Sequence, residues 1–446
     1  MTSILAGKKF GIFALLSALI SISPAMRAQD DPFHLETSAG ANRIRIAVAD
    51  FKPQSGDAGS FKHTFDTTLF ADLTAAGIFD MVSKDMTPQS TPGTPAEINL
   101  GQWSAAPASA AMVAFGNLGV ANSRIVVNGF LDDAKNAQFP QVFAKQYNEA
   151  ASDDSARQIA HRFADEIISR LGGVTGIAET KIYYVKVLGG SKEIWEMDYD
   201  GSNQHAITHL GAISISPRVS PDNSRLAFSS LGKDGFQIKM YSLLLGRLVN
   251  FTSAGGTNVS PAWAPNGSQL AFSSSRTGDP EIWVSDPEGR VAHKITSFAG
   301  PDVSPTWNPK TGGQIAWISG RTHLPQLYIM DADGSGVQRL TDGGYATSPS
   351  WSPNGQFLTF AWDRKYGPGA PGGQDIYIME IATKRWIQLT HDSGPCDFPS
   401  WSPDGRHIVF ANGSGSRARI MSMLADGTQK RALTGSGADM PNWSWK

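Results

Sequence analysis

The chain has 446 residues, which allows two or three domains with a substantial hydrophobic core. Its 38 lysine and arginine residues and 40 acidic residues leave a net charge of −2. This charge argues against a protein that binds nucleic acid through a basic surface. The one cysteine, Cys396, excludes a framework of internal disulfides.

Residues 1–28 have the pattern of a secretory signal peptide. Lys8 and Lys9 precede an apolar run at 10–22, and small residues follow as possible cleavage points. The run is too short to favour a membrane span, although an uncleaved anchor is the alternative. We expect a mature protein without a transmembrane segment. Because an exported chain of this size has no disulfides, a bacterial periplasm is a fitting location.

Residues 29–41 are polar and show no regular period, so we expect a flexible N-terminal segment. Alternating apolar residues at 43–51 then predict a strand. An apolar side chain at every fourth position of 61–73 predicts an amphipathic helix that Gly77 can end. Further strand candidates are 78–82, 123–131 and 141–147, and the stretch 86–110 is predicted to be a long loop.

Ser152 is predicted to cap a second helix whose first turn carries two aspartates. Ile159, Phe163, Ile167 and Leu171 would form its buried face, while His161 is expected to be solvated. Residues 42–172 are thus predicted to be a small α/β domain, with its helices on one layer of strands. Residues 172–180 would link it to the rest of the chain.

The remainder of the chain is built from a repeated hairpin. In one copy, Ser402-Pro403-Asp404-Gly405 predicts a type I turn between two short apolar runs. The proline that opens each copy recurs at intervals of 44, 44, 44, 50 and 42 residues. These prolines are Pro217, Pro261, Pro305, Pro349, Pro399 and Pro441. A period of about 40–45 residues with four short strands per unit is typical of a β-propeller.

The last copy contains only a first strand, at 441–445, before the chain ends. Three strands near 181–187, 193–198 and 205–208 lack a first strand of their own. We expect the C-terminal strand to join them, which would close a ring of six blades over 173–446 and remove its open edges. The alternative is an open array of hairpins with both ends unpaired.

A tryptophan occupies the same place in five successive first strands, which favours packing between neighbouring blades over ligand binding. These residues are Trp263, Trp307, Trp351, Trp401 and Trp443. Cys396, beside Asp397, is expected to be structural and to lie in a loop between blades.

The sequence contains no nucleophile elbow, phosphate-binding loop or His-Glu-x-x-His zinc pattern. The segments 198–202 and 331–335 resemble calcium loops, but their glycine comes fourth rather than sixth, so we interpret both as turns. Five histidines (His209, His293, His323, His391 and His407) could form a site only if the blades brought them to one rim. We therefore predict no enzyme activity, no cofactor and no metal.

The loops that lead into the first strands surround one mouth of the predicted channel. They are the stretches 209–216, 253–260, 297–304, 342–348, 391–398 and 435–440, and they are rich in glycine and serine with scattered acids. Such loops are suited to contacting another protein. The longer spacing near Pro349 comes from an insertion at 365–374, which should project on the same face either as a tolerated loop or as a partner-binding element.

In this order of parts the chain resembles the TolB family, the periplasmic components of the Tol–Pal system. The resemblance covers nearly the whole mature chain. Its more specific features are the strand at 46–51, the stretch 79–82, Gly101-Gln102-Trp103 in the proline-rich loop, and the run 176–184 into the ring.

The resemblance implies a non-enzymatic, monomeric scaffold that supports outer-membrane integrity and envelope constriction during cell division. The propeller of such a scaffold binds the peptidoglycan-associated lipoprotein Pal, and the N-terminal segment 29–41 binds the inner-membrane protein TolA. The Pal-binding rim would include Thr257, Asn258, Ser260, Val303 and Ser304. Two alternatives stay open: a secreted propeller hydrolase or lyase, and an exported interaction propeller with other partners.

Overall fold

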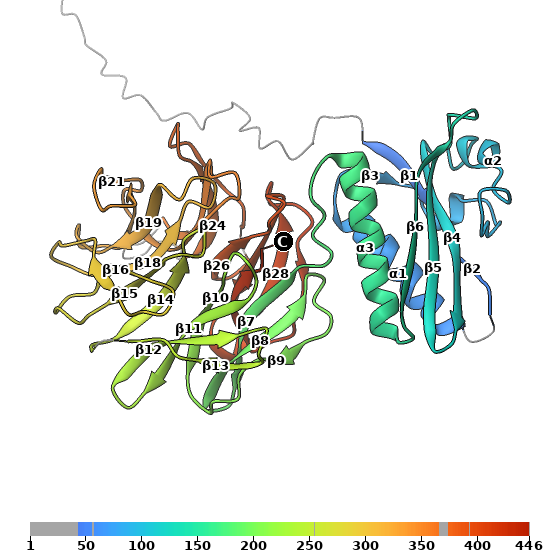
Figure 1. Cartoon of the computed structure of the whole chain (residues 1–446). Coiled ribbons are helices and arrows are strands. Elements are labelled where there is room, and N and C mark those ends of the chain that lie inside the picture. The colour runs from blue at the N-terminus through green and yellow to red at the C-terminus, as the bar shows by residue number, and fades with distance from the viewer. Residues whose placement is uncertain (1–42, 56–57, 254, 365–372, 392, 446) are drawn as a thin grey trace, which may run out of the picture. The chain divides into compact units, whose positions relative to one another are not determined.

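The computed structural model describes residues 43–55, 58–253, 255–364, 373–391 and 393–445 (Figure 1). The predicted signal peptide, the N-terminal segment 29–41 and most of the insertion at 365–374 lie outside the described residues. The domain limits 42–172 and 173–446 stay predictions.

The first domain contains one mixed sheet with the strand order β3-β1-β4-β5-β6. Strand β1 runs parallel to β3 and β4, whereas β4, β5 and β6 are antiparallel. A short sixth strand, β2, pairs with β4. The strands are β1 (Ile44–Val48), β2 (Lys52–Pro53), β3 (Phe79–Met81), β4 (Met112–Ala121), β5 (Arg124–Asp133) and β6 (Gln141–Ala150).

Helices α1 (Gly59–Ala75) and α3 (Asp153–Gly172) pack on one face of this sheet. Ile46 and Val48 point to that face, while Ala47 and Ala49 point to the other, as the alternation of a strand requires. The predicted cap is confirmed, because the Ser152 hydroxyl accepts a hydrogen bond from the amide of Ser155.

Strand β4 lies within a stretch for which the sequence predicted no strand. Its residues are buried on both faces and include Gly116 and Gly119, so it shows no alternation of apolar and polar side chains. A Cβ atom at Gly116 would lie 2.6 Å from the ring of Phe51, so glycine is needed for the close approach. The predicted loop at 86–110 contains a short helix, α2 (Leu100–Ser104), which buries Trp103; the 3₁₀ turn η2 (Lys84–Met86) begins just before this stretch.

The rest of the described chain forms six four-stranded antiparallel sheets, the blades of a propeller (Figure 1). In chain order after the closing blade they are β10 (Ser214–Val219), β11 (Arg225–Gly232), β12 (Gly235–Ser242), β13 (Arg247–Val249); β14 (Asn258–Trp263), β15 (Leu270–Ser274), β16 (Glu281–Ser285), β17 (Ala292–Lys294); β18 (Asp302–Trp307), β19 (Gln314–Ser319), β20 (Gln326–Asp331), β21 (Gln338–Arg339); β22 (Tyr345–Trp351), β23 (Phe357–Asp363), β24 (Asp375–Glu380), β25 (Trp386–Gln388); and β26 (Cys396–Trp401), β27 (His407–Asn412), β28 (Arg419–Leu424), β29 (Arg431–Ala432), with the 3₁₀ turn η3 (Gly415–Arg417) before β28.

The closing blade confirms the predicted ring. Its strand order is β30 (Ala438–Trp443), β7 (Lys181–Leu188), β8 (Ser191–Asp198) and β9 (His205–Ala206). Beyond the ladder, the amide of Lys181 donates to the Ser444 hydroxyl, and the amide of Ser444 donates to the carbonyl of Lys181. The fold is therefore mainly β: a six-bladed propeller closed by its C-terminal strand and preceded by an α/β domain.

Each inner strand carries a bulge immediately before its proline. The residue there adopts a left-handed conformation with φ between 49° and 55°, and in the five complete copies and the closing strand these residues are Ser216, Ser260, Ser304, Ser348, Phe398 and Met440. The pairing register shifts at the same place in every blade, for example between Val259 and Ala262. The bulge therefore re-aims the side chains that follow the proline.

The repeated tryptophans pack between blades, as predicted. Their exposed fractions lie between 3% and 7%. The indole of Trp263 donates to the carbonyl of Arg218 in the preceding blade, and that of Trp351 donates to the carbonyl of Thr306.

Two sequence predictions were wrong. Cys396 is buried as expected of a structural residue, but it is the first residue of β26 rather than part of a loop. His161 is 3% exposed rather than solvated. Its Nδ1 lies 2.7 Å from a carboxylate oxygen of Asp72, because α1 packs over the face of α3 that the sequence made polar. The Tyr199 hydroxyl, from the start of the propeller, donates to the other oxygen of Asp72.

Candidate protein-binding site

The rim residues predicted from the sequence lie at the start of two neighbouring inner strands, β14 and β18. Thr257 is exposed, whereas Ser260, Val303 and Ser304 are half-buried. Asn258 is fully buried. The strands therefore bring the five residues to one mouth of the propeller, but only part of the set presents accessible side chains.

Asn258 instead holds an arginine that the sequence analysis missed. Its Oδ1 accepts from Nη2 of Arg276 at 3.0 Å, and its amide nitrogen donates to Gln237. The guanidinium of Arg276 stacks 4.4 Å from the ring centre of Trp283. These contacts orient the cation near Thr257, so Asn258 acts by positioning Arg276.

The next blade repeats this arrangement with an ion pair. Asp302 is fully buried and lies 2.9 Å from Nη2 of Arg321, while the Ser319 hydroxyl accepts from Nε of the same guanidinium. Arg321 stacks 4.8 Å from the ring of Phe298, which is exposed. The sequence held a signal for both arginines: Arg276 and Arg321 are each followed by threonine and stand one repeat apart.

The opposite side of the same mouth is acidic. Asp397 and Asp439 stand two residues before the motif proline in β26 and β30, the place that Val303 takes in β18. Burial raises the pKa of both carboxyls, and the charge of Asp439 adds to the effect on Asp397. In a ring of six blades, β26 lies opposite β14 and β30 lies opposite β18. The mouth is therefore cationic on one side and acidic on the other.

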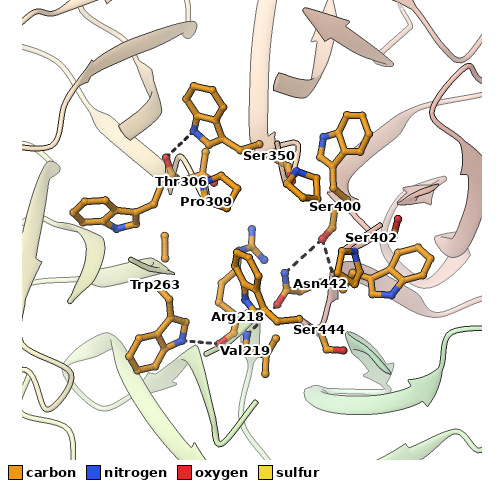
Figure 2. A pocket seen from close by; sticks show the side chains of 18 of the residues that line it. Arg218, Val219, Trp263, Thr306, Pro309, Ser350, Ser400, Ser402, Asn442 and Ser444 are labelled. Carbon is orange, nitrogen blue, oxygen red and sulfur yellow. Dashed lines mark hydrogen bonds between the residues drawn. The ribbon is translucent and has the colours of Figure 1, made fainter. Parts of the chain in front are cut away.

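The far end of the channel is a separate cavity of about 110 Å³ (Figure 2). It opens among the turns that follow the inner strands, because Pro309, Pro353 and Pro403 line it. Its walls carry the repeated tryptophans together with Trp445. Arg218 is the one charged residue of its lining.

Within the described ranges, no three or more histidine, cysteine, aspartate or glutamate side chains gather closely enough to hold a metal ion. Of the helices in those ranges, none has the length and apolarity needed to span a bilayer.

Two family models match the chain: the TolB amino-terminal domain over residues 37–138 and the TolB beta propeller domain over residues 168–446. A Tol-Pal system protein TolB of Geobacter sulfurreducens is 32% identical over 224 residues, which are 49% of this chain and 50% of the relative. One from Roseobacter denitrificans is 28% identical over 226 residues, again 49% and 50%. The chain thus spans about half the length of the curated relatives it matches.

The crystal structure of TolB from Acinetobacter baumannii superimposes with a TM-score of 0.75 at 24% identity, over 90% of this chain and 97% of that one. This likeness bears on the fold, and it includes the ring. Since the propeller model alone matches more than half of the residues, the chain belongs to the TolB family.

Proposed function

We propose that this protein is a periplasmic, non-enzymatic scaffold of the Tol–Pal system that links Pal to TolA. In this role it would support outer-membrane integrity and envelope constriction during cell division. Family membership supports the assignment to the system. The observation that carries the binding role is the mouth around Thr257 and Val303, where oriented arginines face two carboxylates across the channel.

A surface of this kind suits a folded protein partner. Complementary charges fix the orientation of a docked protein and speed its association, while the apolar contacts provide affinity. Exposed Phe298, stacked on Arg321, is an aromatic anchor beside the predicted rim residues. Thr257, Asn258, Ser260, Val303 and Ser304 are therefore proposed as the Pal-binding rim, with Asn258 acting through Arg276.

The N-terminal segment 29–41 is proposed as the TolA-binding element. We further propose that Pal binding at the propeller and the state of this segment are linked. The linkage requires that Pal bind more tightly in one state of the segment than in the other.

Affinity capture tests the proposal. The tagged exported protein is incubated with periplasmic and membrane extract, and retained proteins are identified by mass spectrometry. We expect a Pal-like lipoprotein, and its loss from a variant carrying Thr257→Arg and Val303→Arg. The control is His293→Arg, which places the same charge on an exposed outer strand of the blade that Thr257 precedes.

The outcomes separate the two parts of the proposal. Capture of no lipoprotein by the unaltered protein would contradict the Tol–Pal role. Capture that survives the double substitution would keep that role but place the interface elsewhere.

A further inference from the structure

The residue after the motif proline faces the channel in every blade. The six positions are Arg218, Ala262, Thr306, Ser350, Ser400 and Asn442, and all six line the cavity at the far end of the channel. Figure 2 shows Arg218 inside this ring, with Thr306, Ser350, Ser400 and Asn442 around it. Ring closure thus gathers one cation, three hydroxyls and one amide from different blades.

Arg218 has no carboxylate partner. Its Nη1 donates to the carbonyl of Pro217 at 2.8 Å, and among the described residues no aspartate or glutamate pairs with it or lines the cavity. Burial alone lowers the pKa of Arg218 to about 10, so the side chain stays charged at neutral pH. Withdrawing a cation from water costs several kcal/mol unless an anion or strong acceptors compensate.

The surrounding groups supply hydrogen-bond donors. In the described part of the chain, no hydrogen bond engages the side-chain hydroxyls of Thr306 and Ser350. The Ser400 oxygen accepts from the amide of Trp443 at 3.0 Å, which leaves its own hydrogen available to donate. Guanidinium and hydroxyl donors around an acid-free cavity are the groups that bind an oxyanion.

We infer that this cavity binds a carboxylate group, held by the guanidinium of Arg218 and by the hydroxyls of Thr306, Ser350 and Ser400. A carboxylate matches the planar fork of an arginine and carries the single negative charge that one cation neutralises. A phosphate would carry nearly two charges at neutral pH and meet one cation. The indole and proline walls can accept the carbon stem of the ligand.

The cavity lies at the other end of the channel from Thr257 and Val303, because the inner strands run from one mouth to the other. Binding there does not depend on the proposed Pal interface. The carboxylate can come from a small free acid or from the C-terminus of a peptide that enters from the side of the turns.

Calorimetric titration of the exported protein at constant ionic strength tests the inference. The probes are sodium acetate, the dipeptide acetyl-Gly-Leu with a free carboxylate, and the same dipeptide as its amide. We expect saturable binding of at least one free carboxylate and none of the amide. Binding of acetate alone would indicate a small acid, and stronger binding of the dipeptide would indicate a chain terminus.

Two variants localise the binding. Arg218→Gln should weaken it about 10- to 100-fold, since a hydrogen bond to a charged group contributes about 1.5–3 kcal/mol. Arg247→Gln, at an exposed arginine on the outer strand of the same blade, should leave it unchanged. If Arg218→Gln fails to fold, Thr306→Val with Ser350→Ala should still weaken binding several-fold. Absence of saturable binding, or equal binding by Arg218→Gln and the unaltered protein, would overturn the inference.

Discussion

Replacing Tyr199 by phenylalanine tests how the first domain is joined to the propeller. The Tyr199 hydroxyl donates to Asp72, and the other oxygen of Asp72 contacts His161. Each of the three residues is 3% exposed. Tyr199→Phe keeps the ring and removes one of the two hydrogen bonds to a buried carboxylate.

The expected loss follows from the chemistry of the acceptor. A hydrogen bond to a charged group contributes about 1.5–3 kcal/mol, and no water can easily replace the hydroxyl at a site this buried. We expect Tyr199→Phe to reduce the free energy of unfolding by about 2 kcal/mol. Asp72→Ala should cost more, about 3–5 kcal/mol, because it leaves both partners buried without an acceptor.

Urea denaturation followed by tryptophan fluorescence and circular dichroism measures these changes. Tyr241→Phe is the matched control, because no hydrogen bond engages the Tyr241 hydroxyl among the described residues. A double-mutant cycle with His161→Gln should give a coupling energy above about 0.5 kcal/mol between Tyr199 and His161. A loss no larger than that of Tyr241→Phe would refute the reasoning that the hydroxyl stabilises the junction.

Three further predictions follow from particular residues. Burial lowers the pKa of His161, but its hydrogen bond to Asp72 and the charge of Asp72 outweigh burial and raise the pKa above its ordinary 6.5; stability should therefore be full below pH 6.5 and fall as the pH rises through the folded pKa, and denaturation of His161→Gln should not show this fall. Burial raises the pKa of Asp404, but the charge of His407 and hydrogen bonds from His407 and Ser402 lower it below 3.8 overall; Asp404→Asn should flatten the loss of stability below pH 3.8 in acid titrations. Trp443→Ala removes a buried indole from the closing strand and its hydrogen bond to Thr180, and should cost about 3–5 kcal/mol and speed amide exchange in β30 and β7.

Deletion of residues 29–41 should change the affinity for Pal, measured by calorimetry with purified lipoprotein. Unchanged affinity would contradict the proposed linkage while leaving the Pal interface itself in place.

The propeller could be predicted from the sequence because its information is local and repeated. Each copy of the motif contains its own turn, proline and tryptophan, and the interval between copies identifies the architecture. Even the closure by β30 followed from counting strands, since the first blade lacked one and the last copy supplied one. The caps and apolar faces of α1 and α3 were readable for the same reason.

What the sequence could not determine were contacts between residues far apart in the chain. The burial of His161 depends on Asp72, 89 residues away, and β4 showed no alternation because both of its faces are covered. The orientation of Arg276 by Asn258 depends on how one hairpin folds back on another. Arg218 looked like any residue after a proline, and only ring closure placed it among hydroxyls from three other blades with no carboxylate beside it. Local propensity and periodicity specify the blades, whereas the charge and hydrogen bonding of the channel arise from side chains that meet only when the ring is closed.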